Sequence, residues 1–180
     1  DDNQQWAGIT PQGLAIDSDN NVIICGSHYN GDHYDLHIQK LNGNNFTKIW
    51  SKRIDTVDYH NMYGGGIAVD GADNIYINGT FRGQVGLNNV YRTLIMKLDM
   101  SGTVQWSRDV KGECAQGNGS IVVGPNDGNL YLASISYTPV DNQNYEWHQA
   151  KQTVALACYS SADGKVLWQN YLVQNQLSQT

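Results

Sequence analysis

A repeated pattern of strands and turns is the feature that most restricts how this chain can fold. Residues 13–17 read GLAID, residues 66–70 read GIAVD, and residues 120–124 read SIVVG. Each of these segments leads through a short turn rich in Asp, Asn or Gly into a second apolar segment, which reads NVIICG, NIYING or NLYLAS. Self-similarity at a steady period indicates a repeat architecture.

The second half of each unit repeats as well. A residue pair at 40–41 (KL), 97–98 (KL) or 158–159 (CY) precedes another turn. A tryptophan then closes each unit, and these are Trp50, Trp106, Trp168 and, ahead of the first unit, Trp6. Each unit therefore contains four short strand-like segments, at a period of about 50 to 60 residues.

The period and the strand pattern select one architecture. No segment keeps helical periodicity for three turns, which excludes helical solenoids. A parallel β-helix has shorter repeats, and a sandwich does not repeat its sequence. We therefore expect an all-β β-propeller of four-stranded antiparallel blades, with about three blades present. Residues 1–12 are expected to be the end of a preceding blade, and the three blades are expected at residues 13–57, 64–111 and 117–172. Residues 173–180 would be a tail or the start of a next blade.

Two known repeat families share these motifs. The series GIAVD, turn, NIYING, followed by KLD, SG and VQW, resembles bacterial seven-bladed-propeller repeats. Residues 161–168 (SADGKVLW) resemble the quinoprotein-type propeller repeat. The resemblance runs from Gly13 to about Leu172 and implies the architecture, whereas such repeats serve enzymes, assembly factors and virion or surface proteins alike. The quinoprotein type implies a cofactor with a metal over the ring centre, but no matching ligand residues can be carried over, so no cofactor is expected.

Three blades raise the question of ring closure, because propellers have 4–8 blades. The further blades either belong to a longer chain or come from other copies of this one. The missing initiator Met and the Gln-rich residues 173–180 favour the longer chain. Assembly from several copies is the alternative.

Composition excludes several classes of function. The net charge of −6 and the lack of any Lys/Arg cluster argue against a nucleic-acid partner. No apolar run approaches the ~18 residues of a membrane span, so no membrane insertion is expected. The only glutamates, Glu113 and Glu146, fall in different predicted loops, which disfavours a paired-glutamate mechanism. Cys25, Cys114 and Cys158 lack metal-ligand spacing, and the first and last, in apolar strands, are predicted to be small buried residues.

The two faces of the predicted disc differ in their chemistry. On one face, the turns between first and second strands and between third and fourth strands are tight and rich in Asp, Asn and Gly. On the other, longer loops are expected at residues 28–34, 81–92, 137–150 and, between blades, 59–63. Aromatic rings with polar tips, placed on loops over a rigid scaffold, are typical of contact surfaces. The candidate ligand- or partner-binding residues are His28, Tyr29, His33, Tyr34, Tyr59, His60, Tyr63, Arg82, Tyr91, Arg92, Tyr145, Trp147 and His148.

The expected function is a non-catalytic scaffold that presents this loop face to a protein or glycan, in an extracellular, cell-envelope or virion-surface setting. No nucleophile elbow, zinc-protease motif or phosphate loop occurs, and neither a catalytic residue nor a metal site is predicted. A metal site on the loop of His28 and His33, with Asp32 and Asp35, stays open as an alternative. Two further alternatives are part of a propeller enzyme, quinoprotein-like or lyase-like, with chemistry at the central channel, and a spacer subunit of a phage-tail type assembly.

Overall fold

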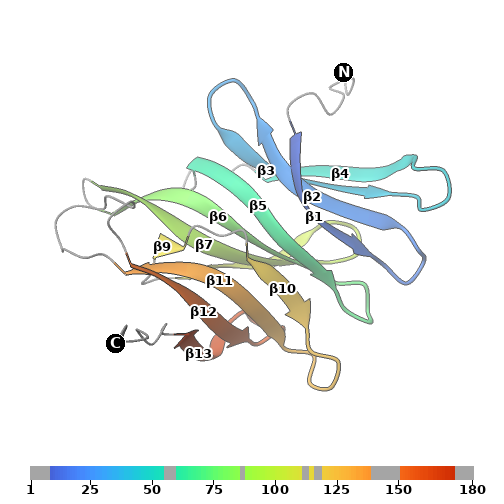
Figure 1. Cartoon of the computed structure of the whole chain (residues 1–180). Helices are drawn as coiled ribbons and strands as arrows, with labels where there is room; N and C mark the ends of the chain where they lie inside the picture. The colour runs from blue at the N-terminus through green and yellow to red at the C-terminus, as the bar shows by residue number, and fades with distance from the viewer. Residues whose placement is uncertain are drawn as a thin grey trace, which may run out of the picture.

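The described part of the chain folds into three antiparallel β-sheets that lie side by side (Figure 1). The computed structural model describes residues 9–54, 60–85, 88–110, 114–115, 119–138 and 151–172. Every regular element within these ranges is a β-strand. None of the described residues forms a helix that could span a membrane. The predicted all-β fold of four-stranded blades is therefore confirmed.

Blade 1 is a sheet of four strands paired in chain order. These are β1 (Ile9–Ile16), β2 (Val22–Tyr29), β3 (Tyr34–Leu41) and β4 (Lys48–Ile54). The alternation of apolar and polar residues in β2 and β3 gives each strand one face for the core. The innermost strand begins at Ile9, ahead of the predicted Gly13, because residues before Gly13 continue the ladder with β2.

Blade 2 has the same order of strands but longer inner hairpins. Its strands are β5 (His60–Val69), β6 (Ile75–Val85), β7 (Asn88–Leu98) and β8 (Val104–Val110). The prediction of a long loop at residues 81–92 was wrong for most of that range. Its residues pair from Phe81 with Arg92 to Val85 with Asn88, because its β-branched and aromatic residues extend the ladder.

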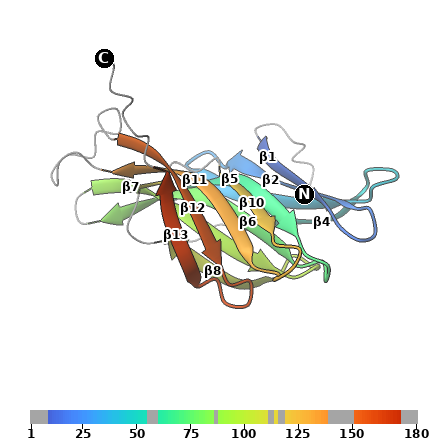
Figure 2. The same ribbon diagram turned by 60° about the horizontal axis from the view of Figure 1, so that its bottom comes forward.

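Blade 3 repeats the four-strand pattern with one short addition. Its strands are β10 (Ser120–Val123), β11 (Leu130–Thr138), β12 (Lys151–Tyr159) and β13 (Val166–Leu172), and β9 (Cys114–Ala115) pairs with β11 beside β10. Blade 2 lies between blades 1 and 3 (Figures 1 and 2).

Tight Asp-based turns join the first two strands of blades 1 and 2, as predicted. The Asp17 Oδ1 atom accepts the backbone N–H of Asn21 at 2.8 Å, and the Asp70 Oδ1 atom accepts that of Asn74 at 2.9 Å. Asp73, at φ 60°, takes the left-handed conformation that Asp and Asn tolerate. The same residue binds blade 1, since the Ser18 hydroxyl donates to its Oδ2 atom at 2.6 Å.

Two apolar clusters hold the blades together. The first joins Ile23 and Ile38 of blade 1 to Ile77 of blade 2, and the second joins Tyr76 of blade 2 to Leu132 of blade 3. Burying one apolar side chain of this size stabilises the folded state by about 1.5–3 kcal/mol relative to leaving it exposed. The core thus lies between the blades, and alternate residues of β6 serve opposite clusters.

The cysteines in the apolar strands belong to this interior, as predicted. Cys25 and Cys158 are free and buried. Burial raises the pKa of the Cys25 thiol to about 12, which keeps it in the unreactive protonated form. Nothing is described of the Cys114 side chain.

The innermost strands approach one another closely where glycine allows it. The Gly66 N–H donates to the Gly119 carbonyl at 3.0 Å, between blades 2 and 3. A Cβ atom on Gly66 would lie 2.8 Å from that oxygen and 2.9 Å from the Ile121 nitrogen. Likewise, a Cβ atom on Gly13 would lie 2.6 Å from the Gly65 oxygen, between blades 1 and 2.

Gly66→Ala should lower the free energy of unfolding by about 1–3 kcal/mol, because the added methyl group meets backbone atoms that cannot move aside. Urea denaturation measures the change. Gly71→Ala is the matched control, since a Cβ atom there meets nothing within 4 Å. Equal losses in the two variants would contradict the role given to close packing.

Acid should weaken the turn between β12 and β13. A hydrogen bond from Lys165 holds the pKa of Asp163 at about 2, below its usual 3.8. A carboxyl with a depressed folded-state pKa contributes stability above pH ~4, which is lost as the pH falls toward ~2. The urea midpoint of Asp163→Asn should therefore fall less steeply across this window than that of the wild type. Parallel slopes would show that the Asp163–Lys165 contact is energetically silent.

Candidate functional site

A four-residue turn connects β2 to β3 and carries the best-defined part of the loop face. The Asn30 side-chain oxygen accepts the backbone N–H groups of Asp32 and His33, each at 3.0 Å. The Asn30 N–H donates to the His33 carbonyl, also at 3.0 Å. Gly31, at φ 106°, takes a conformation that other residues rarely adopt. The sequence NGDH is therefore a self-bonded turn rather than a loose loop.

Three tyrosine rings form a row from this turn across the boundary between blades 1 and 2. The ring centroids of Tyr29 and Tyr34 lie 5.2 Å apart, and those of Tyr34 and Tyr63 lie 5.1 Å apart. Such tilted pairs are favourable for aromatic rings. We call Tyr29, Tyr34 and Tyr63 the tyrosine row. Tyr29, at its outer end, is 49% exposed.

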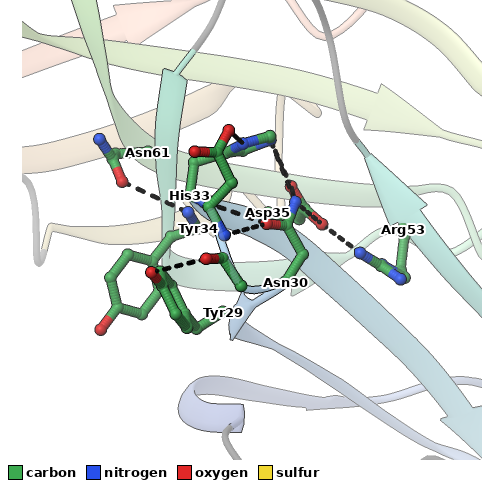
Figure 3. Close-up of polar contacts among 9 residues, drawn as sticks. Tyr29, Asn30, His33, Tyr34, Asp35, Arg53 and Asn61 are labelled. Carbon is green, nitrogen blue, oxygen red and sulfur yellow. Dashed lines mark hydrogen bonds and ion pairs between the residues drawn. The ribbon is translucent and has the colours of Figure 1, made fainter.

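Two hydrogen bonds keep the row in place. The Tyr29 hydroxyl donates to the Gly31 carbonyl at 3.0 Å, which ties the outer ring to the turn. The Tyr34 backbone N–H donates to the Asn61 Oδ1 atom at 3.3 Å, which ties β3 to β5 (Figure 3). Asn61 has φ 53°, a left-handed conformation that Asn tolerates better than most residues.

A buried carboxylate organises the polar groups next to the row. Asp35 is 0% exposed, and its oxygens lie 2.5 Å from an Arg53 nitrogen and 3.0 Å from the His33 Nε2 atom. The Asn30 amide donates to both Asp35 oxygens, at 3.1 and 3.2 Å (Figure 3). The other ring nitrogen of His33 faces Asp32 at 3.2 Å. We call Asn30, His33, Asp35 and Arg53 the Asp35 network.

The Asp35 network lies on the side of blade 1 that faces away from blade 2. Asp35 alternates with Leu36, which packs into the cluster between the two blades. His37 follows on the outward side, where its Nε2 atom lies 2.7 Å from the Ser51 hydroxyl. Burial lowers the pKa of His37, which favours its neutral form. This side of blade 1 therefore carries a polar network near the turn, while Leu14 and Ile16 of β1, which alternate with the core residue Ala15, are exposed apolar residues on it.

The structure brings together part of the predicted site. Tyr29, Tyr34 and Tyr63 form the row, and His33 lies beside it. His28 is in β2 rather than in a loop and is buried at 8% exposure, edge-on to His37 at 6.1 Å between ring centroids. Among the described residues, no three His, Cys, Asp or Glu side chains are placed to hold a metal ion. His33 contacts the carboxylates of Asp32 and Asp35.

The remaining predicted residues are on strands or outside the described ranges. Arg82 is half-buried in β6, and Arg92 in β7 pairs with Asp109 at 2.6 Å. His60 and Tyr91 lie on β5 and β7, where only their backbone is described. Four predicted residues lie outside the described ranges, and these are Tyr59, Tyr145, Trp147 and His148.

Sequence reasoning missed three residues that hold the site, which are Asn30, Arg53 and Asn61, and it considered Asp35 only as a possible metal ligand. The available signal was weak, because Asp35 alternates with Tyr34 and Leu36 in β3, and a charged residue in such an alternation is expected on the solvent side of a strand. Its burial depends on partners from β4 and the turn, which the sequence pattern does not indicate.

No protein-family model matches the chain, and no curated protein matches it. Among solved structures, the chain is similar to an inulosucrase from Halalkalicoccus jeotgali bound to kestose, with a TM-score of 0.53 and 11% sequence identity. The match covers 89% of this chain and 53% of the inulosucrase chain, so this chain spans about half the length of that structure. At this identity the similarity concerns the fold alone, and it agrees with propeller blades.

Asp35→Ala should lower the free energy of unfolding by about 1–3 kcal/mol, because it leaves Asn30 and Arg53 without their buried acceptor. Asp32→Ala is the control: it removes the neighbouring carboxylate, which is 94% exposed, and should change stability by less than about 0.5 kcal/mol. Thermal or urea unfolding of both variants tests the difference. Similar losses would mean that the Asp35 network does not hold the turn.

Proposed function

We propose that this protein is a non-catalytic propeller module that binds glycans at the tyrosine row. The observation that carries the proposal is a fixed row of three rings on the loop face, with the outer ring half-exposed. The C–H faces of sugar rings pack on flat aromatic rings, whose negative faces attract them. Tyrosine is well suited to this role because little conformational freedom is lost on binding.

The groups beside the row support a glycan over a protein partner. The Arg53 guanidinium and the Asp32 carboxylate are planar, and planar groups match pairs of neighbouring hydroxyls. The Arg53 side chain is 50% exposed, and its ion pair with Asp35 engages one of its nitrogens. Among the described residues at this turn, Tyr29 is the one exposed large apolar side chain, whereas protein interfaces centre on larger apolar patches.

The solved structure with similar fold suggests the first ligand to try. That inulosucrase was bound to kestose, a short oligosaccharide, and kestose is a compact probe for a shallow row of rings. We expect a dissociation constant of about 1 mM, typical of weak binding at an open surface. An extracellular, cell-envelope or virion-surface location would place the row where glycans occur.

Tyr29→Ala should abolish kestose binding, measured by saturation-transfer NMR, while far-UV circular dichroism stays unchanged. Tyr29→Phe should keep most of the binding, since the hydroxyl is engaged by the Gly31 carbonyl. Phe46→Ala is the control, because Phe46 is an exposed aromatic residue in the turn between β3 and β4, at the other end of the strands. Retained binding in Tyr29→Ala, across kestose and a glycan panel, would contradict the proposal and favour a protein partner or a spacer role.

The same samples test the enzyme alternative. We expect kestose to remain intact by mass spectrometry after prolonged incubation with the protein. Cleavage or transfer products that disappear in Asp35→Asn would instead favour part of a propeller enzyme.

A further inference from the structure

The same tryptophan contact joins each blade to the one that follows it in the sequence. The indole N–H of Trp50, in blade 1, donates to the Met100 carbonyl of blade 2 at 3.2 Å. The indole N–H of Trp106, in blade 2, donates to the Ser161 carbonyl of blade 3 at 3.3 Å. Both acceptors lie in the turn between the third and fourth strands of the next blade. We call this contact the tryptophan latch.

A glycine in the receiving turn makes room for each tryptophan. A Cβ atom on Gly102 would lie 3.2 Å from the Trp50 ring, and one on Gly164 would lie 2.7 Å from the Trp106 ring. Both glycines have positive φ, at 80° and 70°. The latch therefore requires a carbonyl and a glycine within one turn.

Blade 3 carries a third tryptophan in the same position. Trp168 lies across the sheet from Cys158 and Tyr131, as Trp106 lies across from Lys97 and Tyr76. The ring contact repeats as well, with centroids 6.0 Å apart for Tyr131 and Trp168 and 6.3 Å apart for Tyr76 and Trp106. Trp106 packs against the cluster between blades 2 and 3, whereas its counterpart Trp168 is 43% exposed.

Apolar side chains surround Trp168 on the side of blade 3 that faces away from blade 2. This open side is the counterpart of the sides of blades 1 and 2 that the next blade covers. Its exposed large apolar residues are Val122, Ile135, Val154, Trp168 and Leu172. Contiguous exposed apolar patches are uncommon on soluble proteins and are typical of interaction sites.

Blade 1 of a second copy does not fit this surface. In blade 1, Phe46 stands where blade 3 has Gly164, because its N–H closes the same turn onto Asn42 that Gly164 closes onto Ser160. Phe46 has φ 57°, so its Cβ atom would lie where the tryptophan ring packs. The outward side of blade 1 exposes Leu14 and Ile16 but also carries the Asp35 network, and its charged groups would lose their hydration against an apolar side.

We propose that the open side of blade 3 docks a fourth four-stranded blade that follows β13 in the same polypeptide. The basis is that Trp50 and Trp106 each latch onto the next blade in sequence, and connections between consecutive elements are short. The fourth blade carries a glycine in the turn between its third and fourth strands and offers a carbonyl to Trp168. Ser120 replaces the close-packing Gly13 and Gly66, so the fourth blade is held mainly at its outer, tryptophan end.

The test appends a blade of known sequence to the chain. A copy of residues 55–110 is placed directly after Leu172, which keeps the spacing that separates Trp50 from blade 2. Hydrogen exchange of the Trp168 indole N–H, followed by NMR, should slow about tenfold or more relative to the unextended chain, which corresponds to about 1.4 kcal/mol. Trp50 and Trp106 serve as internal references.

A matched extension with Gly102→Phe in the appended copy should leave Trp168 in fast exchange. The proposal would be overturned if both extensions slowed the exchange of the Trp168 indole N–H equally. It would also be overturned if neither did so although the appended blade is folded. Concentration-dependent protection of Trp168 in the unextended chain that Leu14→Asp in blade 1 removes would overturn it as well, because a second copy would then be the occupant.

If the appended blade does not fold, the unextended chain decides. Gly164→Phe should speed the indole exchange of Trp106 about tenfold or more. Gly128→Phe should not, because Gly128 also has a positive φ of 67° but its Cβ atom would meet nothing within 4 Å. Continued protection of Trp106 in Gly164→Phe would overturn the proposal, since a glycine would then not be what the latch selects.

Discussion

The burial of blade sides against one another is the constraint on which the rest of this structure depends. A four-stranded sheet has two sides, and blade 2 is stable because blade 1 covers one of them and blade 3 the other. The contact is closest at the innermost strands, where Gly66 bonds backbone to backbone with Gly119. At the outer strands, tryptophan latches set the spacing. The apolar side chains fill the space between two blades, and the innermost-strand contacts and the tryptophan latches together set the width of that space.

This packing also explains where the polar and aromatic groups of the loop face lie. Inter-blade surfaces are apolar and covered, so polar and aromatic groups collect at the ends of the strands, where turns emerge. The tyrosine row uses this arrangement, because Tyr29 and Tyr34 come from blade 1 and Tyr63 from blade 2. The packing between blades 1 and 2 therefore fixes where the three rings meet. The Asp35 network keeps the turn of blade 1 in one conformation beside it.

Much of the fold could be predicted from the sequence because repeat, alternation and turn chemistry are local properties. The turns at Asp17 and Asp70 follow from side chains that bond to the backbone a few residues away. The site was harder to predict. His28 was predicted in a loop, but strand pairing buries it. The β-branched and aromatic residues among 81–92 favour a strand, but only their pairing across β6 and β7 shows that the ladder continues. Asp35 and Arg53 are partners only because β3 and β4 are neighbours.

The sequence by itself determined that this protein has three four-stranded β units and which residues form their turns, since those features depend on neighbours along the chain. Only the tertiary structure decided that the two open sides differ. Sequence alone left a ring of several copies as an alternative to a longer chain. The packing of Trp106 on Gly164 shows that the turn between the third and fourth strands of the receiving blade needs a glycine. In blade 1, Phe46 occupies the equivalent position. That requirement depends on contacts between residues more than fifty positions apart, which no local pattern records.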